Sequence, residues 1–177
     1  MPVSVKGAIG LRKALRAYSP DLAKGLTKEM GAALKPVVRQ AKGFLPSDSQ
    51  ILSNWAGTAT RADKKFPQYN QATARKGVAY KTSPSKPNRK GFRSLATIFN
   101  KSAAGAIYET AGRKNGNSVF VRNLDNKYPA RLAGEQKMRG RVIYRAWEEN
   151  QGKATAGVLR AIERASATFQ ARSKVNE

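Results

Sequence analysis

The fold is decided first by residues 11–41, "LRKALRAYSPDLAKGLTKEMGAALKPVVRQA". Apolar residues recur in this stretch at spacings of three and four, the period of one face of an α-helix. They are Leu11, Leu15, Tyr18, Leu22, Leu26, Met30, Leu34, Val37 and Ala41. The segment "SPDL" at 19–22 interrupts the stripe, because Ser19 can cap a new helix that has Pro20 in its first position. The pattern predicts a short helix near 7–17 and a longer one near 20–43, with a kink at Pro36.

The far end of the chain repeats this helical pattern. A long helix is predicted over about 139–171, with one apolar face and one basic face. The apolar face comprises Ile143, Trp147, Ala154, Val158, Ile162, Ala165 and Phe169. The cations that fall largely on the opposite face are Arg141, Arg145, Lys153, Arg160 and Arg164. We therefore expect a long helix at each end of the chain.

The residues between these helices show shorter patterns. Alternating apolar residues predict strands at 77–83, 92–99 and 118–123. A short helix is expected within 102–116, and 127–140 is expected to be a polar connection. The predicted class is α+β, with long N-terminal and C-terminal helices packed on a small antiparallel sheet.

A length of 177 residues fits a single domain. Composition separates four regions within it. We expect a helical region at 1–45, a basic loop and strand region at 46–103, a mixed region at 104–138 and the C-terminal helix at 139–172.

Charge is the most unusual property of the composition. Lys and Arg together number 34 against 11 Asp and Glu, a formal net charge of +23. This excess favours polyanions as partners. Proline, glycine and five cations but no acid lie in "KTSPSKPNRKGFRS", residues 81–94, for which we predict a basic hairpin or long loop. The candidate basic surface facing DNA or a partner is Lys64, Lys65, Arg75, Lys76, Lys81, Lys86, Arg89, Lys90 and Arg93.

Three aromatic residues flank this loop, namely Tyr80, Phe92 and Phe99. Single-strand binders place aromatic side chains among cations, where bases stack on them. The same residues could instead be the inward side of short strands. A loop that neutralises phosphates without contacting bases is the simplest interpretation of the charge.

Catalysis and metal binding find little support in the sequence. Without His, the chain lacks the commonest general base and metal ligand, and without Cys it lacks thiolate chemistry. Glu109, in "IYETAG", is interpreted either as half of an intersubunit salt bridge or as an exposed helix acid. Glu149 is spaced for surface ion pairs with Arg145 and Lys153. We predict no enzyme, no metal site and no cofactor.

Two further absences bear on location. No run of about 18 apolar residues is present, so no transmembrane helix is expected. The N-terminal residues 1–20 lack a secretory apolar core. We expect the protein to stay inside a cell, or inside an assembly made there.

The order of four segments adds to these patterns. A basic helical start leads into "LPSDSQILSNW" at 45–55, then "AIYETAG" at 106–112, and a closing helical segment from Val142. In this order the chain resembles the HK97 gp10-like family of tailed-phage neck and tail-completion proteins. The residues that match the motifs of this family are Pro46, Ser47, Asp48, Ser49, Leu52, Tyr108, Glu109 and Gly112, while Gln50 stands where family members often have glycine.

The resemblance implies a structural role. Copies would form a ring at the head–tail junction or the top of the tail, around the channel for double-stranded DNA, and would contact neighbouring neck and tail-tube proteins. Glu109, Trp55 and Trp147 are then candidate intersubunit contacts, although core packing is the alternative for both Trp residues. The implied location is the virion, after assembly in the host cytoplasm.

A second hypothesis is a free basic nucleic-acid-binding protein of nucleoid or ribosome-associated type. Such a protein should concentrate its cations on an element that fits a groove. It should also bind duplex DNA tightly as a monomer, with strong salt dependence. The ring hypothesis predicts weak binding by the monomer and a tendency to form closed rings.

Overall fold

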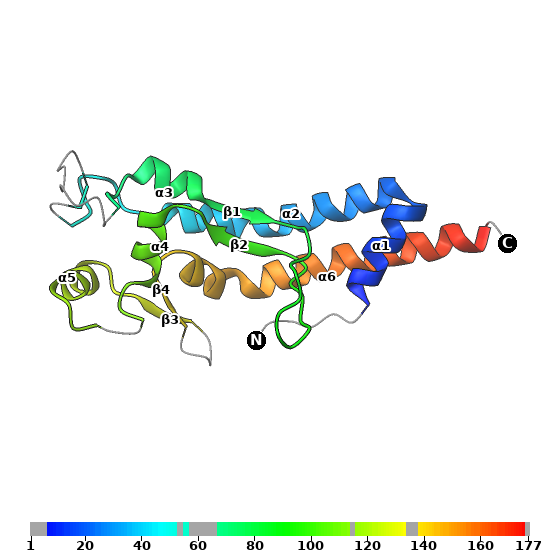
Figure 1. The fold of residues 1–177 in the computed structure, drawn as a ribbon. Coiled ribbons are helices and arrows are strands. Elements are labelled where there is room, and N and C mark those ends of the chain that lie inside the picture. The colour runs from blue at the N-terminus through cyan, green and yellow to red at the C-terminus, as the bar shows by residue number, and fades with distance from the viewer. Residues whose placement is uncertain (1–6, 53–54, 57–66, 114–115, 134–137, 176–177) are drawn as a thin grey trace. The chain divides into compact units, whose positions relative to one another are not determined.

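The structure is a computed structural model that describes residues 7–52, 55–56, 67–113, 116–133 and 138–175. Its elements in chain order are α1 (Ala8–Tyr18), α2 (Pro20–Gly43), α3 (Gln71–Gly77), β1 (Val78–Lys81), β2 (Thr97–Asn100), α4 (Ala103–Thr110), α5 (Val119–Lys127), β3 (Arg131–Ala133), β4 (Met138–Gly140) and α6 (Ile143–Val175) (Figure 1). Strand β1 pairs with β2, and β3 pairs with β4. The predicted α+β class is confirmed.

The chain forms two compact units, and each combines segments that are distant in the sequence. The first unit comprises Met1–Pro36, Tyr80–Thr97 and Asn150–Glu177. The second comprises Val37–Ala79 and Ile98–Glu149. Of the four regions expected from composition, 1–45, 46–103 and 139–172 therefore contribute to both units, and 104–138 lies within the second.

The two predicted N-terminal helices are confirmed as α1, which belongs to the first unit, and α2, whose residues after Pro36 belong to the second. Helix α2 begins at Pro20, and the carbonyl oxygen of Ser19 accepts the N–H of Ala23 at 3.1 Å, so the helical hydrogen bonds start at the residue predicted to cap it. Apolar residues of α1, α2 and α6 then form the buried core of the first unit. Its members are Ala8, Leu15, Leu26, Met30, Ala161, Ile162 and Ala165.

Small residues allow close approaches within the first unit. A Cβ atom added to Gly157 of α6 would lie 2.7 Å from the Cβ of Ala33 of α2. A Cβ atom added to Gly31 of α2 would lie 2.9 Å from the hydroxyl oxygen of Tyr80, at the end of β1. Both distances are shorter than real Cβ atoms show, so an added methyl group at Gly157 would overlap Ala33, whereas at Gly31 the end of the Tyr80 side chain would have to move.

The second unit has a core rich in aromatic rings. Tyr69 and Tyr108 are almost completely buried, and their ring centroids lie 6.2 Å apart. Asn70 caps helix α3, because its side chain accepts the N–H of Thr73 at 2.8 Å. Ser102 caps helix α4 in the same way, because its hydroxyl oxygen accepts the N–H of Gly105 at 3.0 Å. These side-chain caps satisfy N–H groups that the helices themselves leave unpaired.

The predicted strand at 118–123 is wrong, because these residues begin helix α5. Ser118 caps this helix by accepting the N–H of Val121 at 3.2 Å. Val121 and Leu124, three residues apart, are buried, whereas Val119 is 62% exposed. The alternation that suggested a strand came from β-branched residues, and helix capping with burial at helical spacing overrides that propensity.

The predicted polar connection at 127–140 is also wrong, because it contains two strands. Strands β3 and β4 pair antiparallel, with Arg131 opposite Gly140 and Ala133 opposite Met138. Because 138–140 belong to β4, helix α6 begins at Ile143 and not near 139, and it continues to Val175. Backbone pairing does not require an alternating apolar pattern, so this short hairpin left no signal in the sequence.

The strands predicted at 77–83 and 92–99 are present in shortened form. They are β1, over Val78–Lys81, and β2, over Thr97–Asn100. Residues 82–96, which join them, contain neither helix nor strand. The prediction of a basic loop at 81–94 is thus confirmed for the conformation of the chain.

The close approach of Gly157 to Ala33 gives a test of the first unit. We expect Gly157→Ala to lower the free energy of unfolding by about 1–3 kcal/mol, because the added methyl group overlaps Ala33. Gly152→Ala is the matched control in the same helix, where an added Cβ meets nothing within 4 Å. It should raise stability by about 0.5–1 kcal/mol through helix propensity. Urea unfolding measures both, and equal stabilisation by the two substitutions would contradict the packing.

Candidate functional site

Several of the described carboxylates form ion pairs within the chain. Asp125 pairs with Arg141, Glu149 with Arg145, and Asp21 with Arg172. Within the described ranges, no group of three or more acids could hold a metal ion. The acid that stands out is Glu109, because it is 4% exposed.

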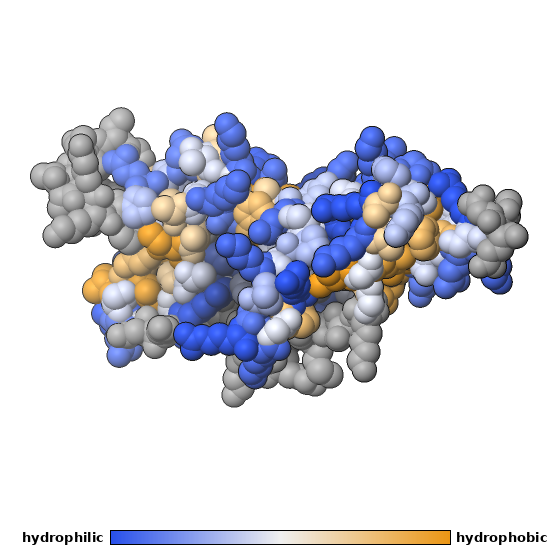
Figure 2. All heavy atoms as spheres, turned by 45° about the vertical axis from the view of Figure 1, so that its right-hand side comes forward, coloured by the Kyte–Doolittle hydropathy of each residue, from blue (hydrophilic) through white to orange (hydrophobic). Residues whose placement is uncertain are grey.

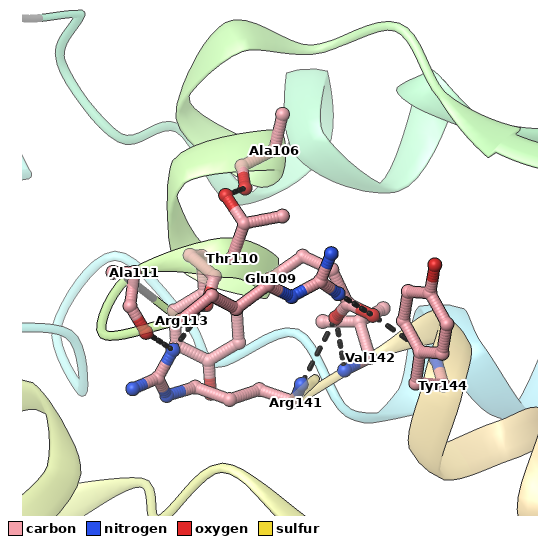
Figure 3. Close-up of polar contacts among 9 residues, drawn as sticks. Ala106, Glu109, Thr110, Ala111, Arg113, Arg141, Val142 and Tyr144 are labelled. Atoms are coloured by element: carbon pink, nitrogen blue, oxygen red, sulfur yellow. Dashed lines mark hydrogen bonds and ion pairs between the residues drawn. The ribbon is translucent and has the colours of Figure 1, made fainter. Parts of the chain in front are cut away.

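Glu109 lies at the end of α4 and reaches the beginning of α6, within the second unit (Figure 3). One carboxylate oxygen, Oε2, accepts the backbone N–H groups of Arg141 at 3.0 Å and Val142 at 2.5 Å. The other oxygen, Oε1, accepts the N–H of Tyr144 at 3.0 Å and lies 3.9 Å from the guanidinium of Arg113. The carboxylate therefore caps a helix that begins more than 30 residues later in the chain.

The environment of Glu109 has opposing effects on its ionisation. Burial raises the pKa of the carboxyl group, while the three backbone N–H groups and Arg113 favour the anion. The N-terminus of a helix also favours a negative charge. Gly140 leaves room for the carboxylate, since a Cβ atom there would lie 2.4 Å from Oε1 and overlap it.

Arg141 is the second centre of this buried network. Its Nε donates to the carbonyl oxygen of Tyr128 at 2.7 Å, and one terminal nitrogen donates to the carbonyl oxygens of Tyr108 and Ala111. The other terminal nitrogen lies 2.5 Å from the carboxylate of Asp125. One side chain that is 3% exposed thus joins α4, α5 and the start of α6. We call Glu109, Arg141 and these partners the Glu109–Arg141 network.

Both sequence-based interpretations of Glu109 are wrong. A carboxylate that is 4% exposed is neither an exposed helix acid nor free to pair with a second subunit. Three of its partners are backbone N–H groups, which any sequence provides, so the spacing of charged residues, which pairs it only with Arg113 one turn later, could not reveal them. The apolar neighbours Ile107 and Tyr108, directly before it, were the only local sign that this acid is buried.

The segment at 45–55 that carried the family resemblance positions α3 within the second unit. The carbonyl oxygen of Pro46 accepts the hydroxyl of Tyr69 at 2.8 Å. The carboxylate of Asp48 accepts the N–H of Gln71 at 2.7 Å. Gln50 closes the turn, because its Oε1 accepts the N–H of Ser47 at 3.1 Å. These motif residues therefore have structural partners inside the chain.

The two candidate Trp anchors differ in exposure. Trp55 is 4% exposed, its ring contacts Tyr69 and Phe120, and its indole N–H donates to the carbonyl oxygen of Pro67 at 2.9 Å. Trp55 is therefore a core residue, which is the alternative that the sequence left open for it. Trp147 is half-buried in α6, so part of its surface is available to a partner.

A hollow of about 600 Å³ opens in the second unit, with Phe44, Tyr128 and Arg145 among its lining residues. The guanidinium of Arg145 lies 3.9 Å from the ring centroid of Phe44 and pairs with Glu149 at 3.5 Å. Arg141, also at its wall, is committed to the Glu109–Arg141 network. The two arginines at the wall of the hollow are thus engaged within the chain, and we assign the hollow no ligand.

The predicted basic surface is divided by the fold. Arg75 and Lys76 are exposed at the end of α3 in the second unit. Lys64 and Lys65 lie outside the described residues. The five cations of the loop at 81–94 are all exposed in the first unit, and they are Lys81, Lys86, Arg89, Lys90 and Arg93. The fold therefore brings only these five together.

Hydrogen bonds close the basic loop at three levels. At its base, the buried guanidinium of Arg12 in α1 donates to the carbonyl oxygen of Thr82. In its middle, the backbone N–H of Ser85 donates to the carbonyl oxygen of Ser94 at 2.9 Å. At its tip, the backbone N–H of Asn88 donates to the carbonyl oxygen of Phe92 at 2.9 Å. The loop therefore has a defined course, which Figure 1 shows in green between β1 and β2.

The three aromatic residues near the loop have different environments. The hydroxyl and ring of Tyr80 lie against Gly31 of α2, as its predicted inward position requires. The ring of Phe99 is half-buried, with the ammonium of Lys101 at 5.4 Å from its centroid. Phe92 is 43% exposed. The inward interpretation thus holds for Tyr80, while Phe92 is exposed to solvent.

Comparisons with known proteins found no family model, no curated protein and no solved structure that matches this chain. Among the described helices, none combines the length and apolar character that a membrane crossing requires.

The face of the molecule drawn in Figure 2 is mainly hydrophilic, with hydrophobic residues in separate patches. The candidate functional surface is accordingly the basic loop, and the Glu109–Arg141 network supports the fold of the second unit.

We predict that Glu109→Ala lowers the free energy of unfolding by about 2–4 kcal/mol. The substitution leaves three N–H groups at the start of α6 without their acceptor, and two of them belong to buried residues. Glu148→Ala is the matched control, because Glu148 is an exposed acid of α6. It should change stability by less than about 0.5 kcal/mol. Denaturant unfolding compares them, and a similar small loss for both would refute the capping role of Glu109.

Proposed function

We propose that the protein is a non-catalytic structural component of a tailed-phage virion. In this proposal copies assemble into a ring at the head–tail junction or the top of the tail, as a tail-completion, tail-terminator or connector protein. The ring surrounds the channel for double-stranded DNA and contacts neighbouring neck and tail-tube proteins. Assembly takes place in the host cytoplasm.

The observation that carries this proposal is the distribution of exposed cations. They lie on α1, α2, the basic loop, α5 and α6, and include Lys13, Arg16, Lys24, Lys28, Lys35, Arg39, Arg122, Lys127, Lys153 and Arg160. A protein that reads DNA places its cations on the element that enters a groove. Cations spread over many elements instead attract a polyanion without fixing its register, which suits a channel through which DNA passes.

The roles of the motif residues agree with a structural protein. Glu109, the most buried described acid, accepts three backbone N–H groups, so its carboxylate is engaged in holding the backbone at the start of α6. Pro46 and Asp48 hold α3. The two segments that resemble the phage family thus maintain the fold, as expected for an assembly component.

The alternative function, a free basic nucleic-acid-binding protein, draws on the same net charge of +23. The specific observation in its favour is the basic loop, whose five cations are exposed together. The two functions differ in what the isolated chain does. A ring component associates with itself, whereas a free binder remains small and holds DNA tightly.

Light scattering on the purified, nuclease-treated protein in about 1 M NaCl tests the proposal. High salt screens the repulsion between chains and removes bound nucleic acid. We expect one discrete species whose mass is an integer multiple of 19.3 kDa, with only weak binding of duplex DNA by the residual monomer. A monomer at all concentrations that binds duplex DNA tightly, with steep salt dependence, would favour the free binder.

A loop variant serves as the control for this experiment. It replaces the five loop cations, Lys81, Lys86, Arg89, Lys90 and Arg93, by serine. Because these side chains are exposed, the variant should keep its thermal unfolding temperature and its multimeric mass. It should retain less DNA than the wild type in low salt.

A further inference from the structure

We propose that the tip of the basic loop, Asn88–Arg93, binds single-stranded nucleic acid by stacking an unpaired base on Phe92 while the surrounding cations pair with phosphates. This inference goes beyond the proposed function, in which duplex DNA is contacted through charge alone. It also does not depend on a ring, because every residue that it uses belongs to one loop of one chain.

The first observation is the charge around the tip. No Asp or Glu occurs between Asp63 and Glu109, so no acid of that stretch offsets the cations of the loop. Arg89, Lys90 and Arg93 are exposed and lie within four residues of one another in sequence. A cluster of this kind releases counterions from a polyanion when it binds, and this release is the main source of affinity for nucleic acid.

The second observation is the closed backbone of the tip. The side-chain oxygen of Asn88 accepts the N–H groups of Lys90 and Phe92, both at 2.9 Å. The N–H of Gly91 donates to the carbonyl oxygen of Asn88 at 2.8 Å, and the φ angle of Gly91 is 74°, which favours glycine. The backbone is thus held before any ligand arrives, which reduces the entropy cost of binding.

The third observation is the position of Phe92 within this closed tip. Its backbone is held by two hydrogen bonds with Asn88, yet the residue is 43% exposed. Tyr80 and Phe99, by contrast, pack within the protein or against a cation. A partly exposed aromatic residue flanked in sequence by the exposed cations Lys90 and Arg93 combines the two components of a single-strand site, an aromatic face and nearby cations.

The chemistry favours an unpaired base over two other ligands. In duplex DNA the faces of the bases are covered by their neighbours, so a ring at a loop tip reaches only phosphates and groove edges. The carboxylates of an acidic protein surface would pair with the cations. Such a surface does not regularly present a flat ring on which Phe92 could stack. Every unpaired base has a π-face, so stacking on Phe92 needs no particular sequence.

Fluorescence anisotropy with a labelled mixed-sequence DNA strand of about 12 nucleotides, and with the duplex of the same sequence, tests this inference. We expect Phe92→Ala to weaken single-strand binding roughly 5- to 100-fold, the range of one lost base stack, without changing the salt dependence. The same substitution should change the affinity for the duplex by less than about twofold. Phe92→Trp should keep or strengthen single-strand binding, because its larger ring still stacks.

Two controls separate stacking from charge and from general exposure of aromatic rings. Tyr18→Ala removes an aromatic side chain that is 80% exposed on α1, also in the first unit, and should leave both affinities unchanged. The double substitution Arg89→Gln and Lys90→Gln should weaken the binding of both the single strand and the duplex. It should also reduce the slope of log K against log salt by about 0.7 per lost phosphate contact on the single strand.

Three results would overturn the inference. The first is wild-type affinity of Phe92→Ala for the single strand, and the second is an equal loss for single strand and duplex. The third is tight binding of polyglutamate that depends on Phe92 while neither DNA binds, which would assign the tip to an acidic protein partner. The multimeric mass tests the proposed function separately, so the failure of one does not imply the failure of the other.

Discussion

The contact on which the second unit most depends is the one between the Glu109 carboxylate and the backbone N–H groups of Arg141, Val142 and Tyr144, just before and within the first turn of α6. Three backbone donors converge on two oxygen atoms in a site that water hardly reaches. Because buried N–H groups are costly when unpaired, this carboxylate determines where a helix of 33 residues can begin. The guanidinium of Arg141, next to this contact, donates to carbonyl groups at and after the end of α4 and pairs with the carboxylate of Asp125. The β3–β4 hairpin ends directly beside it, at Gly140.

The net charge of +23 sets a second constraint on the molecule. Repulsion among so many cations opposes a compact state, and the few acids offset it only locally. Asp21, Glu29 and Glu149 each pair with an arginine of α6. Being partly or fully exposed, these pairs contribute little to stability, so the apolar contacts of the helices supply most of it. The uncompensated charge is then available for a polyanion.

In the basic loop, the fold gives a group of cations a defined place on the surface of the first unit. Arg12 holds its base, Ser85 and Ser94 hold its middle, and Asn88 holds its tip. These contacts use backbone groups and short polar side chains, and they leave the long cationic side chains exposed. Of the three aromatic residues nearby, the fold buries or half-buries two and leaves Phe92 open to solvent. The loop is therefore an exposed, strongly basic feature of the first unit whose backbone follows a defined course.

Periodicity alone was sufficient to predict α1, α2 and most of α6, because the apolar residues of the buried face of an amphipathic helix recur in its sequence at spacings of three and four. The basic loop was equally visible, since composition and turn residues are local properties. The tertiary structure decided the rest. Whether 118–123 became strand or helix depended on the Ser118 cap and on burial of Val121 and Leu124, and the β3–β4 hairpin depended on backbone pairing. Glu109 was a candidate surface acid by sequence and a buried cap by structure, because three of its partners are backbone N–H groups that no side-chain pattern encodes.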